Sequence, residues 1–244
     1  MPSRMESQRL ESGCEQRLRE VVSSYMAHCS GLESHCTRCL ETLRWGGSVP
    51  LMIVDAAFMS IGLNYFTAVV PAVAAYEQAM NRGAVPSSLS ELAEVSLGDV
   101  STIWRNQRSW EVVRGVAACL REESPNDRVS LTAWAGGTPL SGWEHTPVGR
   151  VKGVGLNTYQ YLRMMGGVDT SMPDKIVRRV MVQILEEAGS DLPTKGDLEL
   201  ISTIETISRV TGRRPIELTW MTWMVQSEGK TMRMEKYREL LQRI

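Results

Sequence analysis

The spacing of apolar residues is the feature that most restricts the fold of this chain. Apolar side chains recur at i, i+3, i+4 and i+7 in one segment after another, whereas regular alternation of polar and apolar residues is rare. The first pattern places apolar side chains on one face of an α-helix, and the second is typical of a half-buried β-strand. The sequence therefore predicts an all-α protein.

Glycine and proline residues divide this pattern into separate helices. The predicted helices span residues 11–44 with a break at Gly31, 51–79 with bends at Gly62 and Pro71, 91–95, 109–123, 157–165, 174–187, 197–211, 215–226 and 231–244. Residues 124–151 are rich in Gly, Pro and Thr, which predicts loops around one or two short helices.

Composition excludes several classes of protein. With 43% hydrophobic and 23% charged residues, the chain of 244 residues is an ordinary globular sequence. Its longest apolar stretch, residues 56–75, is interrupted by polar residues and a proline, and the N-terminus lacks the apolar segment of a secretory signal. The five cysteines do not form the framework of a small secreted scaffold. We therefore expect a cytoplasmic protein without a membrane span.

Residues 151–180, VKGVGLNTYQYLRMMGGVDTSMPDKIVRRV, are the most informative segment. They predict a Gly-x-Gly hairpin at residues 153–155, a helix, a Gly-Gly stop and an aspartate, Asp174, at the start of another helix. Glycines in such a turn leave backbone amides accessible, which suits a phosphate oxygen. Lys and Arg outnumber Asp and Glu in residues 147–179, although the net charge of the whole chain is −1. Positive charge is therefore concentrated around the hairpin.

This segment resembles the helix-hairpin-helix and catalytic-aspartate region of the helix-hairpin-helix DNA glycosylase superfamily. The positions that match the family pattern are Gly153, Val154, Gly155, Gly166, Asp174, Arg179 and Val180. More loosely, residues 54–73 are similar to the family helix whose polar end faces DNA, and residues 106–120 are similar to the helix before the hairpin. Residues 211–225 are similar to a closing helix pair of archaeal members that act on oxidised guanine.

The resemblance implies an all-α, two-lobed fold that holds double-stranded DNA between its lobes. One lobe would span residues 50–185, with the helix-hairpin-helix at about 147–165, and the other would combine residues 1–49 and 186–244. The implied activity is base excision, in which a damaged or mismatched nucleotide is turned out of the duplex and its N-glycosidic bond is cut. We expect a monomer, associated with the nucleoid if the source is bacterial or archaeal.

The resemblance also assigns roles to two residues. Asp174 would stabilise positive charge on the sugar and help to orient a water; its residue type alone favours a helix cap, and the hairpin upstream favours the catalytic role. Bifunctional members have a lysine nucleophile two residues after the second hairpin glycine, where this chain has Asn157. This departure implies a monofunctional, hydrolytic enzyme without strand cleavage. Asn157 fits either a catalytic pocket or a polar position in the first helical turn.

Predicted DNA contacts gather around the hairpin and at one end of the apolar segment. They are Asn64, Arg108, Arg150, Lys152, Gly153, Val154, Gly155 and Lys175. For the charged residues, a solvated surface without DNA is the alternative. Ser60 and Asn64, four residues apart, predict either a helix end that reaches solvent or one that fills the gap left by an extruded base.

Two aromatic residues near the C-terminus are candidates for a base pocket. Trp220 and Trp223 could stack on a base, although tryptophan at helical spacing fills a core at least as readily.

A cluster near the N-terminus is a candidate metal site, comprising His28, Cys29, His35, Cys36 and Cys39. Its cysteines have the C-x6-C-x2-C spacing of the first three ligands in the family's iron–sulfur loop, but they lie at the opposite end of the chain. The segment also fits an amphipathic helix whose cysteines pack as small apolar residues. We predict this second arrangement, with no metal and no cofactor.

Two rival functions remain open at this point. One is a DNA-binding module that keeps the hairpin without the chemistry, and the other is a metal-dependent regulator that uses the Cys/His cluster. The identity of an excised base is not predicted, because pocket side chains would come from several helices.

Overall fold

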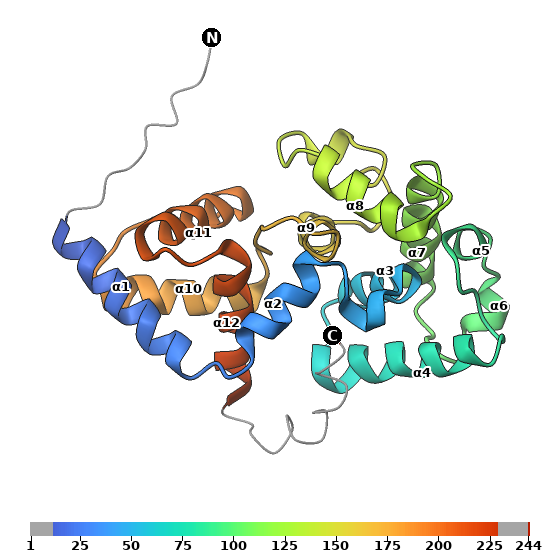
Figure 1. Cartoon of the computed structure of the whole chain (residues 1–244), viewed down its shortest axis with the longest axis horizontal. Helices are drawn as coiled ribbons and strands as arrows, with labels where there is room; N and C mark the ends of the chain where they lie inside the picture. Colours follow the sequence, from blue (N-terminus) through green and yellow to red (C-terminus); the bar gives the residue numbers. More distant parts are fainter. Residues whose placement is uncertain (1–11, 229–243) are drawn as a thin grey trace, which may run out of the picture.

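The computed structural model describes residues 12–228 and 244, and all regular elements in those residues are helical (Figure 1). In chain order they are α1 (Ser12–Ala27), α2 (Leu32–Leu40), the 3-10 turn η1 (Arg44–Gly47), α3 (Val49–Met59), the π-helical turn η2 (Tyr65–Val69), α4 (Val70–Asn81), α5 (Leu89–Ala93), α6 (Leu97–Val100), α7 (Gln107–Leu120), α8 (Asp127–Gly137), the 3-10 turn η3 (Trp143–His145), α9 (Leu156–Met165), α10 (Lys175–Ala188), α11 (Asp197–Thr211) and α12 (Pro215–Glu228). The all-α prediction is confirmed. None of the described helices combines the length and hydrophobicity needed to cross a membrane.

The helices form two groups (Figure 1). In the first group, α1 packs on α10 and α11, and α12 packs on α10. In the second group, α7 packs on α3 and α5, and α9 packs on α3 and α8. Helix α2 contacts both α12 and α9, so it joins the two groups.

The predicted first lobe, residues 50–185, includes α10. In the structure, α10 packs with the other group of helices. The apolar face of α10, which includes Val177, Met181 and Ile184, is buried, and the helix packs on α1 and α12. An amphipathic helix packs where its apolar face is covered, and here the cover comes from both ends of the described chain. The change from one group to the other therefore falls just before Lys175.

The long apolar segment predicted as a single bent helix is divided in the structure. Helix α3 ends at Met59, and Gly62 has a φ of +74°, a left-handed conformation that favours glycine. Ser60 and Asn64 therefore lie in a loop and do not share one face of a helix. Pro71 stands in the first turn of α4, directly after the π-helical turn η2.

Most other predicted helices agree with the structure. The expected break at Gly31 separates α1 from α2, and the segments 157–165, 197–211 and 215–226 correspond to α9, α11 and α12. The predicted helix at 231–244 lies outside the described residues, apart from Ile244.

The glycine hairpin packs directly on α7. Gly153 has a φ of +101°, and a Cβ atom there would lie 2.8 Å from Val112 Cγ2 and 3.4 Å from Arg108 Nε. Both the backbone conformation and this close approach require glycine. The packing brings Arg108 next to the hairpin and fixes the start of α9.

A buried carboxylate on α3 connects segments that are far apart in the sequence. Asp55 Oδ2 accepts hydrogen bonds from Trp45 Nε1 at 2.8 Å, the Tyr161 hydroxyl at 2.9 Å, the Tyr65 hydroxyl at 3.0 Å and Arg44 Nη2 at 3.4 Å. The side chains of Arg44 and Asp55 are completely buried. Burial raises the pKa of Tyr65 far above its usual value, so its hydroxyl remains a neutral donor.

The same cluster reaches the other group of helices through Arg44. Its guanidinium carbon lies 4.8 Å from the centre of the Trp220 ring on α12 and 5.4 Å from that of Tyr161 on α9. Both distances are within the range of a cation–π contact. The Arg44–Asp55 pair therefore lies at the junction between the two groups.

Replacing Asp55 with Asn leaves Arg44 buried without a negative partner. We expect Asp55→Asn to lower the free energy of unfolding by about 3–5 kcal/mol, measured by urea denaturation followed by tryptophan fluorescence. Glu94→Gln is the control, because Glu94 pairs with Arg121 at 2.9 Å on the surface, where such pairs contribute less than about 1 kcal/mol. Equal losses of unfolding free energy in the two variants would contradict the structural role of Asp55.

Candidate functional site

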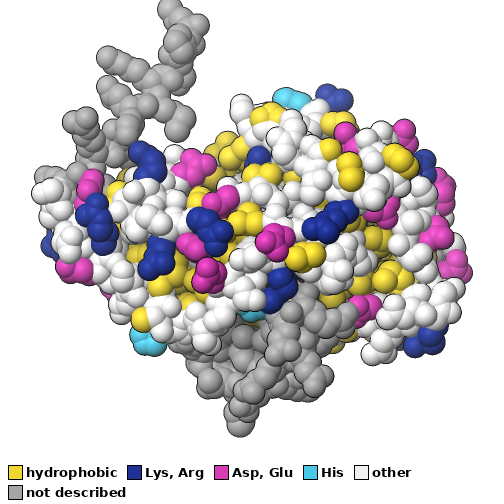
Figure 2. Space-filling view, in the orientation of Figure 1, with side chains coloured by type: hydrophobic (Ala, Val, Ile, Leu, Met, Phe, Trp, Pro, Cys, Tyr) yellow, Lys and Arg dark blue, Asp and Glu magenta, His cyan; other side chains and the backbone are white. Residues whose placement is uncertain are grey.

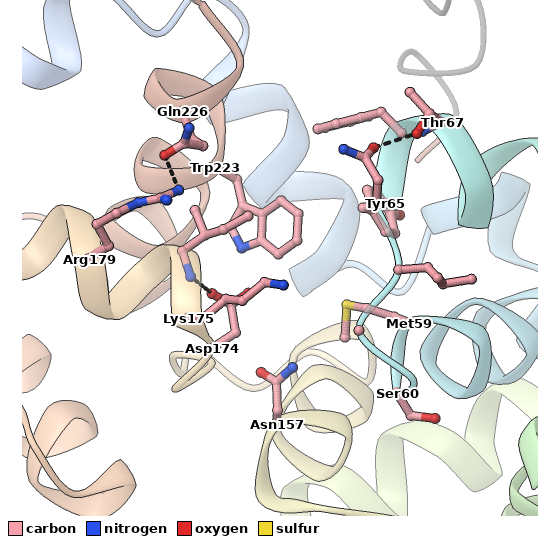
Figure 3. Close-up of a pocket in the computed structure, with 15 residues that line it drawn as sticks. Met59, Ser60, Tyr65, Thr67, Asn157, Asp174, Lys175, Arg179, Trp223 and Gln226 are labelled. Atoms are coloured by element: carbon pink, nitrogen blue, oxygen red, sulfur yellow. Dashed lines mark hydrogen bonds between the residues drawn. The ribbon is translucent and has the colours of Figure 1, made fainter.

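A pocket of about 560 Å³ lies where the two groups of helices meet (Figure 3). One side comes from the loop after α3 and from η2, and the other side comes from α10 and α12, while α9 contributes Asn157. The lining residues are Met59, Ser60, Gly62, Leu63, Asn64, Tyr65, Phe66, Thr67, Asn157, Asp174, Lys175, Ile176, Arg179, Trp223 and Gln226. Asn64, Asn157, Asp174, Lys175 and Trp223, all predicted site residues, are thus brought together.

Asp174 is the residue that begins α10. Its Oδ1 atom accepts hydrogen bonds from the backbone amides of Ile176 at 2.7 Å and Val177 at 2.8 Å. The side chain is therefore a helix cap and a pocket residue at the same time. These two bonds fix the orientation of the carboxylate. Both amides bind Oδ1, and neither binds Oδ2.

The pKa of Asp174 is set by opposing influences. Burial raises it above the usual value, whereas the amides of Val177 and Ile176, hydrogen bonding by Trp223 and the charge of Lys175 lower it in part. The start of α10 is therefore not the dominant influence on the pKa of this carboxyl group. Desolvation in the pocket outweighs it.

Asn157 lies in the first turn of α9, directly after the hairpin. Its Oδ1 atom is buried and has no hydrogen-bond partner among the described residues. In Figure 3 its amide group points toward Asp174. Its neighbours Leu156 and Thr158 are buried, so the backbone on both sides of Asn157 is held by packing.

Three aromatic rings, two from η2 on one side of the pocket and one from α12 on the other, contact one another and form an aromatic wall. The Trp223 ring centre lies 5.7 Å from that of Tyr65 and 6.5 Å from that of Phe66, and Tyr65 and Phe66 are 5.2 Å apart. Sequence reasoning missed Tyr65 and Phe66, although they directly follow the predicted site residue Asn64. Trp220 does not line this pocket, since it is buried against Arg44.

Two cations stand at the rim of the pocket. Lys175 and Arg179 on α10 are exposed, and Arg179 donates a hydrogen bond to Gln226. Asn64 is also exposed, and its side chain accepts a hydrogen bond from the Thr67 amide at 3.0 Å. These polar groups give the pocket a charged entrance.

The hairpin forms a separate basic surface outside the pocket. Arg108, Arg150 and Lys152 are exposed, whereas the side chain of Val154 is buried, so Val154 can offer a ligand only its backbone. On the face shown in Figure 2, Lys and Arg are interspersed with Asp and Glu. A contact with phosphates would therefore be local to the hairpin rather than spread over that face.

The Cys/His cluster forms no metal site in the described part of the chain. No three His, Cys, Asp or Glu side chains of residues 12–228 and 244 are grouped to hold a metal ion. Cys36 and Cys39 are fully buried on the inner face of α2, and burial raises the pKa of both thiols. Cys36 packs in the core, and the Cys39 thiol also accepts a hydrogen bond from Arg44 at 3.9 Å.

No protein-family model, curated protein or solved structure matches this chain. Its function is therefore inferred from the pocket, the hairpin and the segment that connects them.

Proposed function

We propose that this protein is a monofunctional DNA glycosylase with the two-lobed helix-hairpin-helix glycosylase fold. It turns a damaged or mismatched nucleotide out of duplex DNA and hydrolyses its N-glycosidic bond. The observation that supports this most directly is the meeting of Asp174 and Asn157 in one pocket with an aromatic wall. Its volume of about 560 Å³ is in the range of small-molecule sites.

The pocket residues suit the steps of base excision. The partly exposed rings of Phe66 and Trp223 could stack on an extruded base, and the buried ring of Tyr65 packs against both. The carboxylate of Asp174, held rigidly by two backbone amides, would stabilise the positive charge that develops on the sugar. Outside the pocket, the hairpin amides and Lys152 would bind the DNA backbone.

The position of Asn157 supports hydrolysis rather than amine catalysis. An amide nitrogen is not a nucleophile, so no Schiff base forms at this position. The lysine that lines the pocket among the described residues is Lys175, which is exposed at the rim. Borohydride trapping of a covalent protein–DNA adduct would contradict the monofunctional assignment and would make Lys175 the amine to test.

Asp174→Asn removes the charge and keeps a side chain that caps helices equally well. We expect the rate of base release to fall about 100-fold or more while duplex binding and stability stay close to those of the wild type. The assay follows base release from duplexes that contain uracil, thymine mismatches, 8-oxoguanine, alkylated purines or hydroxymethyl bases.

Asp169→Asn is the matched control for this substitution. Asp169 also accepts a hydrogen bond from a helix-end amide, that of Ile216 at 3.0 Å, but does not line the pocket. The Asp169→Asn variant should release bases at the wild-type rate. Equal rates in Asp174→Asn and the wild type would disprove the catalytic assignment, and tight duplex binding without base release by any protein would favour the inactive binding module.

The pH dependence of base release should show the ionisation of Asp174. The carboxylate is the active form, so the rate should fall as the pH drops through its pKa. Because burial raises that pKa, the fall should begin at a higher pH than for an exposed aspartate, whose pKa is about 3.9. Single-turnover rates of the wild type and Asp169→Asn should share this acidic limb. The same limb in the residual activity of Asp174→Asn would refute its assignment.

Lys152→Ala should weaken binding to all duplexes to a similar extent, because a phosphate contact has no sequence preference. The slope of log K against log salt should become less steep by about one unit. Fluorescence anisotropy with an undamaged duplex measures both effects. Lys195→Ala, which removes another exposed lysine in the turn before α11, should leave the slope unchanged, and an unchanged slope in Lys152→Ala would exclude the hairpin contact.

A further inference from the structure

We propose that Asn157 is a second catalytic residue, which holds the attacking water between its side-chain oxygen and Oδ2 of Asp174. The proposal rests on the proposed glycosylase function and deepens it, because it gives Asn157 a defined role at the position where related enzymes use lysine.

The side-chain oxygen of Asn157 is a hydrogen-bond acceptor without a donor in the described part of the chain. This Oδ1 atom is buried. A buried acceptor without a donor is unfavourable, and folded proteins rarely keep one without a functional reason. Asn157 lines the pocket, so a donor can reach it from there.

The orientation of Asp174 is also fixed. Two backbone amides bind Oδ1, and the carboxylate also receives a hydrogen bond from Trp223, so Oδ2 is the oxygen that keeps acceptor capacity for the chemistry of the pocket. Figure 3 shows the amide of Asn157 and the carboxylate of Asp174 on facing elements, with Asn157 pointing toward Asp174. Asn157 lies between buried neighbours in the first turn of α9, and Asp174 is held by two backbone amides, so neither needs to reorganise during the reaction.

A single water molecule satisfies both acceptors. It has two hydrogens, one for Asn157 Oδ1 and one for Asp174 Oδ2, and its remaining lone pairs then face the extruded nucleotide. The water is then already in position to attack when the N-glycosidic bond breaks. Such positioning lowers the entropic cost of the reaction. Leucine has a similar shape but no acceptor. With leucine at position 157, Asp174 alone would hold the water.

The chemical step balances with water as the co-reactant. The bond between the sugar C1′ atom and the base nitrogen breaks, and its electron pair leaves with the base. The water oxygen forms the new bond to C1′, and one water proton passes to Asp174 and from there to solvent or to the departing base. The products are the free base and an abasic sugar.

The experiment compares Asn157→Leu and Asn157→Asp in single-turnover base release, using the duplex on which the wild type is active. Leucine removes the acceptor and aspartate keeps one. We expect the chemical rate to fall about 10–100-fold in Asn157→Leu, with an unchanged dissociation constant for the duplex, and to fall much less in Asn157→Asp.

Asn126→Leu is the control for lost stability. Asn126 caps α8 by accepting a hydrogen bond from the Val129 amide at 3.0 Å, and it does not line the pocket. Its substitution should lower the melting temperature without changing the chemical rate. Asn157→Leu with the wild-type rate, or an equal loss in Asn157→Leu and Asn157→Asp, would overturn the role of Asn157 alone. A wild type that releases no base from any duplex would overturn the proposed function, and this proposal with it.

Discussion

The charge of Asp55 is the constraint on which the arrangement of the pocket depends. One of its oxygens binds Tyr65, which forms part of the pocket wall, and Tyr161, which lies on the helix that also contains Asn157. Its partner Arg44 packs on Trp220 of α12, the helix that contributes Trp223 to the opposite side. A buried ion pair adds little net stability, because removing its two charges from water costs about as much free energy as their attraction returns. Here the pair fixes elements on both sides of the pocket relative to each other.

The chemistry of the pocket depends on two helix starts that face each other. At a helix start the backbone amides lack intrahelical partners, and in α10 two of them are satisfied by Asp174 itself. In α9 the start is set by the hairpin, whose glycine packs against α7 and so determines where Asn157 stands. The hairpin therefore connects an exposed basic surface with the pocket, an arrangement that suits the proposed binding of a DNA backbone and excision of one base.

The sequence predicted the helices well, because apolar periodicity and glycine or proline boundaries are local signals. It also singled out Asn157, Asp174 and Lys175, which line the pocket, because these residues belong to one short segment with a recognisable pattern. It did not predict that α10 packs with the terminal helices or that Ser60 and Asn64 lie in a loop, because both depend on tertiary packing. Tyr65, Phe66 and the Asp55 cluster were missed for a related reason: within an apolar run, such residues are indistinguishable from ordinary core.

The central claim is that Asp174 stabilises positive charge on the sugar of an extruded nucleotide. Affinity for two duplexes tests it without knowledge of the excised base: one has a cationic pyrrolidine in place of a nucleotide, and the other has a neutral tetrahydrofuran. A transition-state mimic should bind more tightly than a neutral analogue. The account predicts that the wild type prefers the pyrrolidine duplex by about tenfold or more and that Asp174→Asn loses this preference. Equal affinities in the wild type, or a preference that persists in Asp174→Asn, would contradict it.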